Sequence, residues 1–98
     1  METKTDRELF ELAAKSVGYW SDEFNCVSDL PHLNWNPLLD DGDALRLAVI
    51  LKITLHIDES LTDAETKNGY FTEAHLSDAC AATRRAIVRA AARIGESK

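Results

Sequence analysis

Three aspartates in the segment "WNPLLDDGDALRLAVIL" (35–51) are the side chains whose types and spacing most suggest chemistry. Asp40, Asp41 and Asp43 surround a glycine, and hard cations such as Ca²⁺ take carboxylate oxygens from loops of this kind. A calcium loop would also need further ligands and a bidentate glutamate about twelve residues along. The chain instead continues as the apolar run "RLAVIL". The segment therefore indicates the capped start of a helix, and we predict no metal site.

Sulfur and imidazole groups are present, but they are not spaced as metal or catalytic motifs are. The cysteines, Cys26 and Cys80, form no CxxC pair, and the 3 histidines form no HxxxH pair. The chain has no GxSxG turn and no phosphate-binding loop among its 4 glycines. We expect Cys80 to be a buried thiol and His56 to lie half-exposed on a strand. We also expect no cofactor and no enzymatic activity.

Charge suggests one candidate binding surface. The net charge is −6, and residues 1–43 hold 10 acidic against 3 basic side chains. An acidic surface can occupy a basic groove on another protein by electrostatic complementarity. The side chains that we assign to this acidic surface, with Trp20 as an exposed aromatic contact beside them, are Glu8, Glu11, Asp22, Glu23, Asp58 and Glu59.

The last helix suggests an alternative surface. Three arginines recur there at every fourth position, with a fourth beside them, and such a basic stripe could follow the phosphates of a nucleic acid. The rest of the chain is acidic and would repel nucleic acid, so the stripe is also explained as a solvated helix face paired with nearby carboxylates. The side chains concerned are Arg84, Arg85, Arg89 and Arg93.

The first element that positions these groups is a helix over 5–17. Thr5 and Glu8 have the spacing of a capping box, in which each side chain bonds the other residue's backbone N–H. Apolar residues follow at helical spacing. Gly18 is placed to end this helix in the left-handed conformation.

Two further helices are predicted over 40–51 and 78–95. The first of them is apolar on nearly every side, so we expect it to be buried on more than one face and to lie centrally against a sheet. The second is rich in alanine, the best helix former, and should begin at Ser77 or Asp78. Gly95 should close it.

The intervals between helices predict strands and turns. A short strand is expected near 24–27, and "KITLHIDES" alternates apolar and polar residues as a half-buried strand over 53–58 does. A returning strand is expected over 70–75. The intervening stretch, 58–69, reads as a long mobile loop, with Asn68-Gly69 as its strongest turn signal.

The order helix, strand, helix, strand, strand, helix predicts an α+β fold. It would have a small, mostly antiparallel sheet of about three strands covered by three helices. A chain of 98 residues suits one domain, 1–98, with frayed ends at 1–4 and 96–98. Trp35 should fill the core beside the second helix.

The segments "WNPLLDDGDALRLAVIL" and "AATRRAIVRAAARIG" resemble a family of small proteins encoded by tailed phages and prophages. The nearest named group is the phage α-β-α sandwich domain, and the resemblance covers residues 5–17, 35–57 and 78–95. It implies a phage accessory gene and supports the sandwich fold. It supplies no catalytic residues.

The expected function is therefore that of a phage- or prophage-encoded accessory protein that acts by binding. The partner would be a host or phage protein, and the action could be inhibition of a host defence system through the acidic surface. A nucleic-acid-binding regulator that uses the arginine stripe is the alternative, although the acidic net charge of the chain argues against nucleic acid as a partner. A polar, acidic N-terminus and the lack of a long apolar run predict a cytoplasmic protein that avoids membranes, as a monomer or homodimer.

Overall fold

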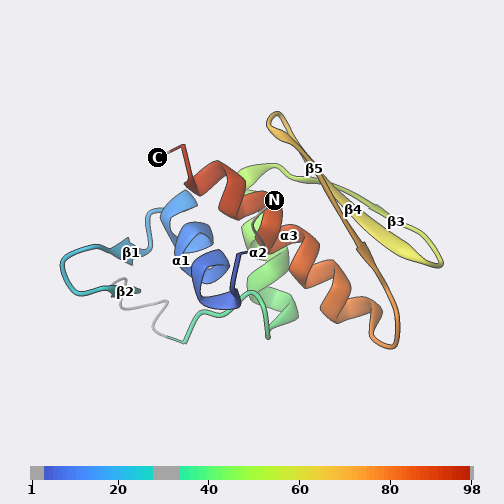
Figure 1. Cartoon of the computed structure of the whole chain (residues 1–98), viewed down its shortest axis with the longest axis horizontal. Coiled ribbons are helices and arrows are strands. Elements are labelled where there is room, and N and C mark those ends of the chain that lie inside the picture. The colour runs from blue at the N-terminus through green and yellow to red at the C-terminus, as the bar shows by residue number, and fades with distance from the viewer. Residues whose placement is uncertain (1–3, 28–33, 98) are drawn as a thin grey trace.

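A computed structural model describes residues 4–27 and 34–97 of the chain, which form three helices and two small antiparallel sheets (Figure 1). The two-stranded sheet pairs β1 (Trp20–Ser21) with β2 (Cys26–Val27). The three-stranded sheet has the order β3 (Thr54–Ile57), β4 (Leu61–Thr66), β5 (Gly69–Ala74). The helices are α1 (Asp6–Ser16), α2 (Asp41–Leu51) and α3 (Ala79–Gly95). The predicted α+β class is confirmed, with one more sheet than expected.

The alanine-rich α3 is the central element. It packs against β4 and β5 on one side and against α1 and α2 on the other (Figure 1). Small side chains let the sheet and both helices approach it closely, and the buried ones are Ala82, Ala86, Ala90, Ala91 and Ala92. The sheet is therefore covered directly by one helix rather than by three.

α2 does not take the central position that its apolar sequence predicted. Only one side of it is buried, through Ala44, Leu47 and Ala48, and this side faces α3. Its opposite side is open to water. The expectation of burial on more than one face was wrong because the alanines of α3, rather than α2, fill the space beside the sheet.

A strand occupies half of the predicted loop over 58–69, so this prediction was also wrong. β4 pairs with both β3 and β5 and is the middle strand of the sheet. Its sequence "LTDAET" places only Thr62, Ala64 and Thr66 on the face toward α3. Threonine and alanine give a weak hydrophobic alternation, which is why the period-two signal was missed.

The β1–β2 hairpin replaces the single strand expected near 24–27. Trp20 pairs with Val27 and Ser21 with Cys26. The turn between them contains Asn25 at φ +55°, a conformation that asparagine tolerates better than most residues. Only the last two residues of the predicted strand are therefore extended and paired.

The two ends of the described chain lie close to each other. Lys4 Nζ lies 3.5 Å from Glu96 Oε2, and both residues belong to the ends that were expected to fray. The fraying expected at 1–3 and 98 falls outside the described residues.

The helix caps agree with the sequence. The N–H of Glu8 donates to Thr5 Oγ1 (3.1 Å) and the N–H of Thr5 donates to Glu8 Oε1 (2.9 Å), so the capping box is confirmed. Gly18 ends α1 at φ +78° as predicted. Asp78 caps α3 by accepting from the N–H of Ala81 at 2.9 Å.

Gly95 is the exception among the caps. It is the last residue of α3. Its φ is not positive, since among the described glycines positive φ occurs at Gly18 and Gly69, so a left-handed helix end does not explain the glycine. A Cβ built on Gly95 would lie 1.9 Å from the carbonyl oxygen of Leu12. Close approach of α1 to α3, and not helix termination, requires glycine at this position.

Replacing Thr5 with alanine should cost about 1 kcal/mol in the free energy of unfolding, because the N-cap side chain is lost. Hydrogen bonds from the backbone and then the side chain of Thr5 hold the pKa of Glu8 below its ordinary value. A lowered folded-state pKa adds stability above the unfolded pKa, and this stability is lost as pH falls through the folded value. Urea unfolding at neutral and at acidic pH should therefore show that the wild type exceeds the variant in unfolding free energy by less in acid. NMR titration should show a higher pKa of Glu8 in the variant. An equal advantage at both pH values would contradict this account.

Candidate protein-binding surface

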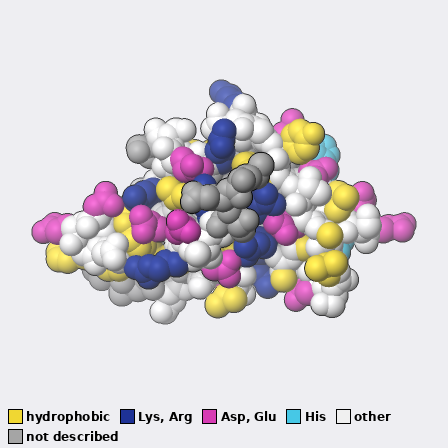
Figure 2. Space-filling view, viewed as in Figure 1, with side chains coloured by type: hydrophobic (Ala, Val, Ile, Leu, Met, Phe, Trp, Pro, Cys, Tyr) yellow, Lys and Arg dark blue, Asp and Glu magenta, His cyan; other side chains and the backbone are white. Residues whose placement is uncertain are grey.

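The predicted acidic surface is divided between two ends of the molecule. The β1–β2 turn carries Asp22 and Glu23, whereas the β3–β4 turn carries Asp58 and Glu59. The two turns lie at opposite ends of the longest dimension, which is 41 Å (Figure 1). On the face drawn in Figure 2, acidic and basic side chains are interspersed. The predicted residues therefore do not form one acidic surface.

Several of these carboxylates have local structural partners. Lys15 Nζ lies 3.2 Å from Glu11 Oε2 and 3.5 Å from Asp22 Oδ1, and the hydrogen bond that Lys15 donates to Glu11 is the main cause of the raised pKa of Lys15. Asp58 Oδ1 accepts from the N–H groups of Ser60 (2.8 Å) and Leu61 (2.9 Å), which lowers its pKa. Hairpin and turn geometry account for these side chains without any partner protein.

The two tryptophans belong to an aromatic cluster beside α1. Trp35 is 6% exposed, so its predicted burial in the core is confirmed. Its ring centroid lies 5.5 Å from those of Phe10 on α1 and Tyr19. Trp20 was predicted to be an exposed contact, but it is half-buried with its ring edge-on to Phe10. Its Nε1 is buried and has no hydrogen-bond partner among the described residues. The β1–β2 pairing turns Trp20 toward α1, which the sequence did not reveal.

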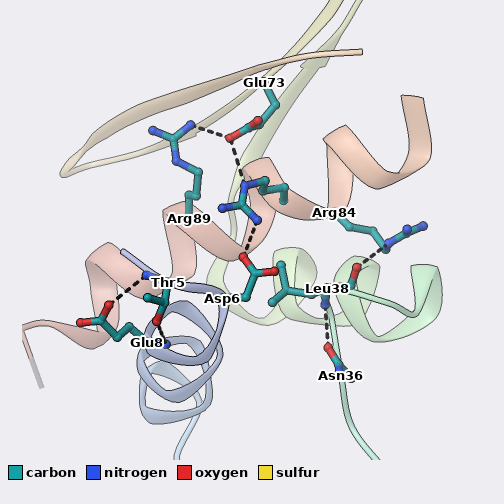
Figure 3. A network of polar contacts seen from close by, with 9 residues as sticks. Thr5, Asp6, Glu8, Asn36, Leu38, Glu73, Arg84 and Arg89 are labelled. Atoms are coloured by element: carbon teal, nitrogen blue, oxygen red, sulfur yellow. Dashed lines mark hydrogen bonds and ion pairs between the residues drawn. The ribbon is translucent and has the colours of Figure 1, made fainter. Parts of the chain in front are cut away.

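Three of the four arginines of the stripe contact other parts of the fold (Figure 3). Arg84 Nε donates to the carbonyl oxygen of Leu38 (2.9 Å), and its Nη1 donates to Asp41 Oδ1 (2.5 Å). Arg84 therefore joins the middle of the chain to α3. This contact also explains Asp41, the second aspartate of the "DDGD" sequence.

The carboxylate of Glu73 on β5 contacts both Arg85 and Arg89 (Figure 3). Arg89 Nη1 lies 2.7 Å from Glu73 Oε2, and Arg85 Nε lies 3.8 Å from the same oxygen. Arg85 Nη1 also donates to Asp6 Oδ1 at 2.7 Å. The side chain of Glu73 is only 21% exposed, so these contacts are better shielded from salt than ordinary surface pairs.

Arg93 is the one arginine of the stripe that remains exposed and without an ion pair within the described ranges. The others connect α3 to α1, to β5 and to the segment before α2. The alternative reading of the stripe, as a helix face paired with carboxylates, therefore agrees with the geometry. The sequence could not show which carboxylates lie nearby, because the partners are up to 79 residues distant.

The remaining aspartates of "DDGD" serve the backbone and α2. Asp40 Oδ2 accepts from the N–H of Asp43 at 2.8 Å, which confirms the predicted N-cap. Asp43 accepts from the N–H of Asn36 (2.9 Å) and from Arg46 (2.8 Å). Within residues 4–27 and 34–97, no three His, Cys, Asp or Glu side chains are placed to hold a metal ion.

The cysteines and histidines form no site in the described segments. Cys80 is exposed on the first turn of α3, so its predicted burial was wrong, and Cys26 is also exposed. His75 is buried instead, with Nε2 2.8 Å from Thr62 Oγ1. His56 is exposed on β3, on the sheet face away from α3.

The surface that sequence reasoning missed is the water-facing side of α2. We define the α2 outer face as Leu45, Val49 and Ile50, which are 59%, 65% and 53% exposed. Leu39, in the turn before the helix, is 76% exposed. Leu45 and Val49 are one helical turn apart and so lie on the same side of the helix. An apolar group of this kind on a small domain marks a binding surface more often than single exposed residues do.

The apolar composition of α2 contained the signal for this surface. The sequence "ALRLAVIL" has more large apolar residues than one buried side of a helix can hold. That surplus was interpreted as burial on several sides. In a chain of 98 residues the core is small, so an exposed apolar side was the competing interpretation.

Comparison of the chain with protein-family models, with curated proteins and with solved structures finds no match. No helix in the described part of the chain combines the length and apolar character needed to cross a membrane.

Proposed function

We propose that this chain is a small protein-binding domain that docks through the α2 outer face. The observation that carries the proposal is the exposure of Leu45, Val49 and Ile50 on one helix, each more than half exposed. Keeping large apolar side chains in water costs free energy that burial against a partner would recover, at about 25 cal/mol per Å² of apolar surface.

The chemistry of this face indicates the kind of partner it fits. An exposed helix with an apolar side is recognised by an apolar groove on another protein. Arg46 lies next to the apolar side chains and is itself 67% exposed. The groove should therefore be apolar at its centre, with a carboxylate or carbonyl oxygens at the rim that faces Arg46.

The biological setting is a proposal of its own, supported by the two motifs that resemble small phage and prophage proteins. In that setting the partner is a host or phage protein, and binding through the α2 outer face suits inhibition of a host defence protein. The acidic surface has less support as the contact, because its residues are divided between the β1–β2 and β3–β4 turns, which lie at opposite ends of the molecule.

Nucleic-acid binding through α3 also has less support, since Arg84, Arg85 and Arg89 already contact carboxylates. We expect no mobility shift of DNA or RNA by the purified chain at about 50 mM salt, where phosphate contacts contribute most. A shift that is lost when Arg93 is replaced with alanine would contradict this expectation.

Capture of a partner from host lysate tests the proposed function. The full chain as bait should retain a specific protein, and retention should persist as salt is raised, because apolar contacts are not screened by ions. The Val49→Asp chain is the matched control and should release the same protein. Capture that fades with salt and survives Val49→Asp would place the contact elsewhere and reject the α2 outer face.

A further inference from the structure

The two edges of the three-stranded sheet are not equivalent. At the β5 edge, Arg89 Nη1 donates to the carbonyl oxygen of Thr72 (3.1 Å), and the guanidinium carbon lies 5.3 Å from the centroid of the Phe71 ring. This edge is therefore covered by a long charged side chain. Such cover is one way in which proteins prevent unwanted strand pairing.

The β3 edge lacks comparable cover. The backbone groups of β3 make their hydrogen bonds with β4, and within the described residues none bonds to any other segment. Figure 1 places β3 on the outer side of the sheet, away from α1. The groups on the free side of this strand are available to pair with another strand.

An apolar side chain at this edge is also uncovered. Ile57 alternates with Ile53 and Leu55, so it points to the sheet face that carries Ala64 and Phe71. Ile53 is buried, yet Ile57 is 61% exposed. A strand added beside β3 would cover Ile57 on the same face.

The residues along this edge would match those of a second copy that runs in the opposite direction. The stretch "KITLHID" (52–58) begins with a base, ends with an acid and has apolar residues at its second, fourth and sixth positions. Antiparallel pairing of two copies about Leu55 would oppose Ile53 with Ile57. It would also bring Lys52, the left-handed C-cap of α2 (φ +57°), near Asp58, which follows the strand. Lys52 is exposed at the end of α2 and has no ion pair within the described ranges.

We propose that the free edge of β3 pairs with β3 of a second copy of this chain, forming a two-fold dimer with a continuous six-stranded antiparallel sheet. The pairing would extend the backbone ladder, align the apolar side chains of both copies on one face and join opposite charges at both ends. This surface is separate from the α2 outer face. Dimerisation and partner binding can therefore succeed or fail independently.

Sedimentation equilibrium of the full chain, at concentrations up to about 1 mM, tests this pairing. We expect a mass approaching twice the chain mass of 10.9 kDa. Ile57→Lys would place a charged side chain at the paired edge. Lys52→Glu would bring a second carboxylate near Asp58 of the other copy. Each variant should weaken the dimer about tenfold, because each change acts at two equivalent places. Val49→Asp is the control and should leave the dimer intact.

Three results would overturn the proposal. They are a single-chain mass at the highest concentration, a dimer that withstands both edge variants, and a dimer that is lost with Val49→Asp. Circular dichroism of Ile57→Lys should match that of the wild type, since the side chain is already exposed. If this variant does not fold, Lys52→Glu decides the question, because it changes only an exposed residue at the end of α2.

Discussion

Replacing Gly95 with alanine should lower the free energy of unfolding by about 3 kcal/mol. The added Cβ would lie 1.9 Å from the carbonyl oxygen of Leu12 and 2.8 Å from its carbonyl carbon. These are backbone atoms of α1, so no side-chain rotation relieves the overlap. The two helices must move apart, and the contact between α1 and α3 is the most extensive between any two elements. Urea unfolding of the purified variant measures the loss.

The matched control is the same substitution at Gly42. A Cβ there would lie 3.2 Å from the guanidinium nitrogens of Arg46 and from Asp40 Oδ2, which are the ends of flexible side chains. Because alanine is the better helix former by about 1 kcal/mol, Gly42→Ala should be neutral or mildly stabilising. Equal losses of unfolding free energy from the two substitutions would show that the close approach of α1 is not the reason for glycine at position 95.

Replacing both Leu45 and Val49 with aspartate should weaken partner binding at least about a hundredfold, which corresponds to about 2.7 kcal/mol. The double variant puts two carboxylates where the α2 outer face would meet an apolar groove, and a buried unpaired charge is costly. Both positions are more than half exposed, so the core should be unaffected. Isothermal titration with the captured partner measures the affinity, and circular dichroism checks the fold.

The control for that series is Asp22→Lys with Glu23→Lys, at the tip of the β1–β2 hairpin. It also changes two side chains and alters charge strongly, but it leaves α2 untouched. Its affinity should stay within about threefold of the wild type. Loss of binding with this control, together with normal binding by the α2 variant, would show that the partner contacts Asp22 and Glu23 rather than α2.

Local features of the sequence were predictable because their causes are local. Thr5 with Glu8, Asp40 and Asp78 cap helices through hydrogen bonds to residues three positions away, so spacing alone locates the helix starts. Gly18 ends α1 for an equally local reason, its positive φ. These features placed all three helices to within a few residues.

Features set by distant neighbours were not predictable from the sequence. α2 is the more apolar helix, yet α3 is central, since small alanines permit packing on two sides. Gly95 looks like a helix terminator, but its reason lies in α1, more than eighty residues earlier in the chain. Arg85 looks solvated until the fold brings Asp6 and Glu73 beside it. The candidate site was missed for the same reason, because exposure of α2 depends on what α3 occupies.

Site-specific photo-crosslinking tests the central claim most directly. A photoreactive phenylalanine analogue would be placed singly at position 49 on α2, at position 22 on the β1–β2 turn and at position 93 on α3. All three positions are exposed, so differences in yield report proximity to the partner. Binding through the α2 outer face predicts a strong covalent adduct from position 49 and little from the other two. An adduct from position 22 or 93 with none from position 49 would contradict it.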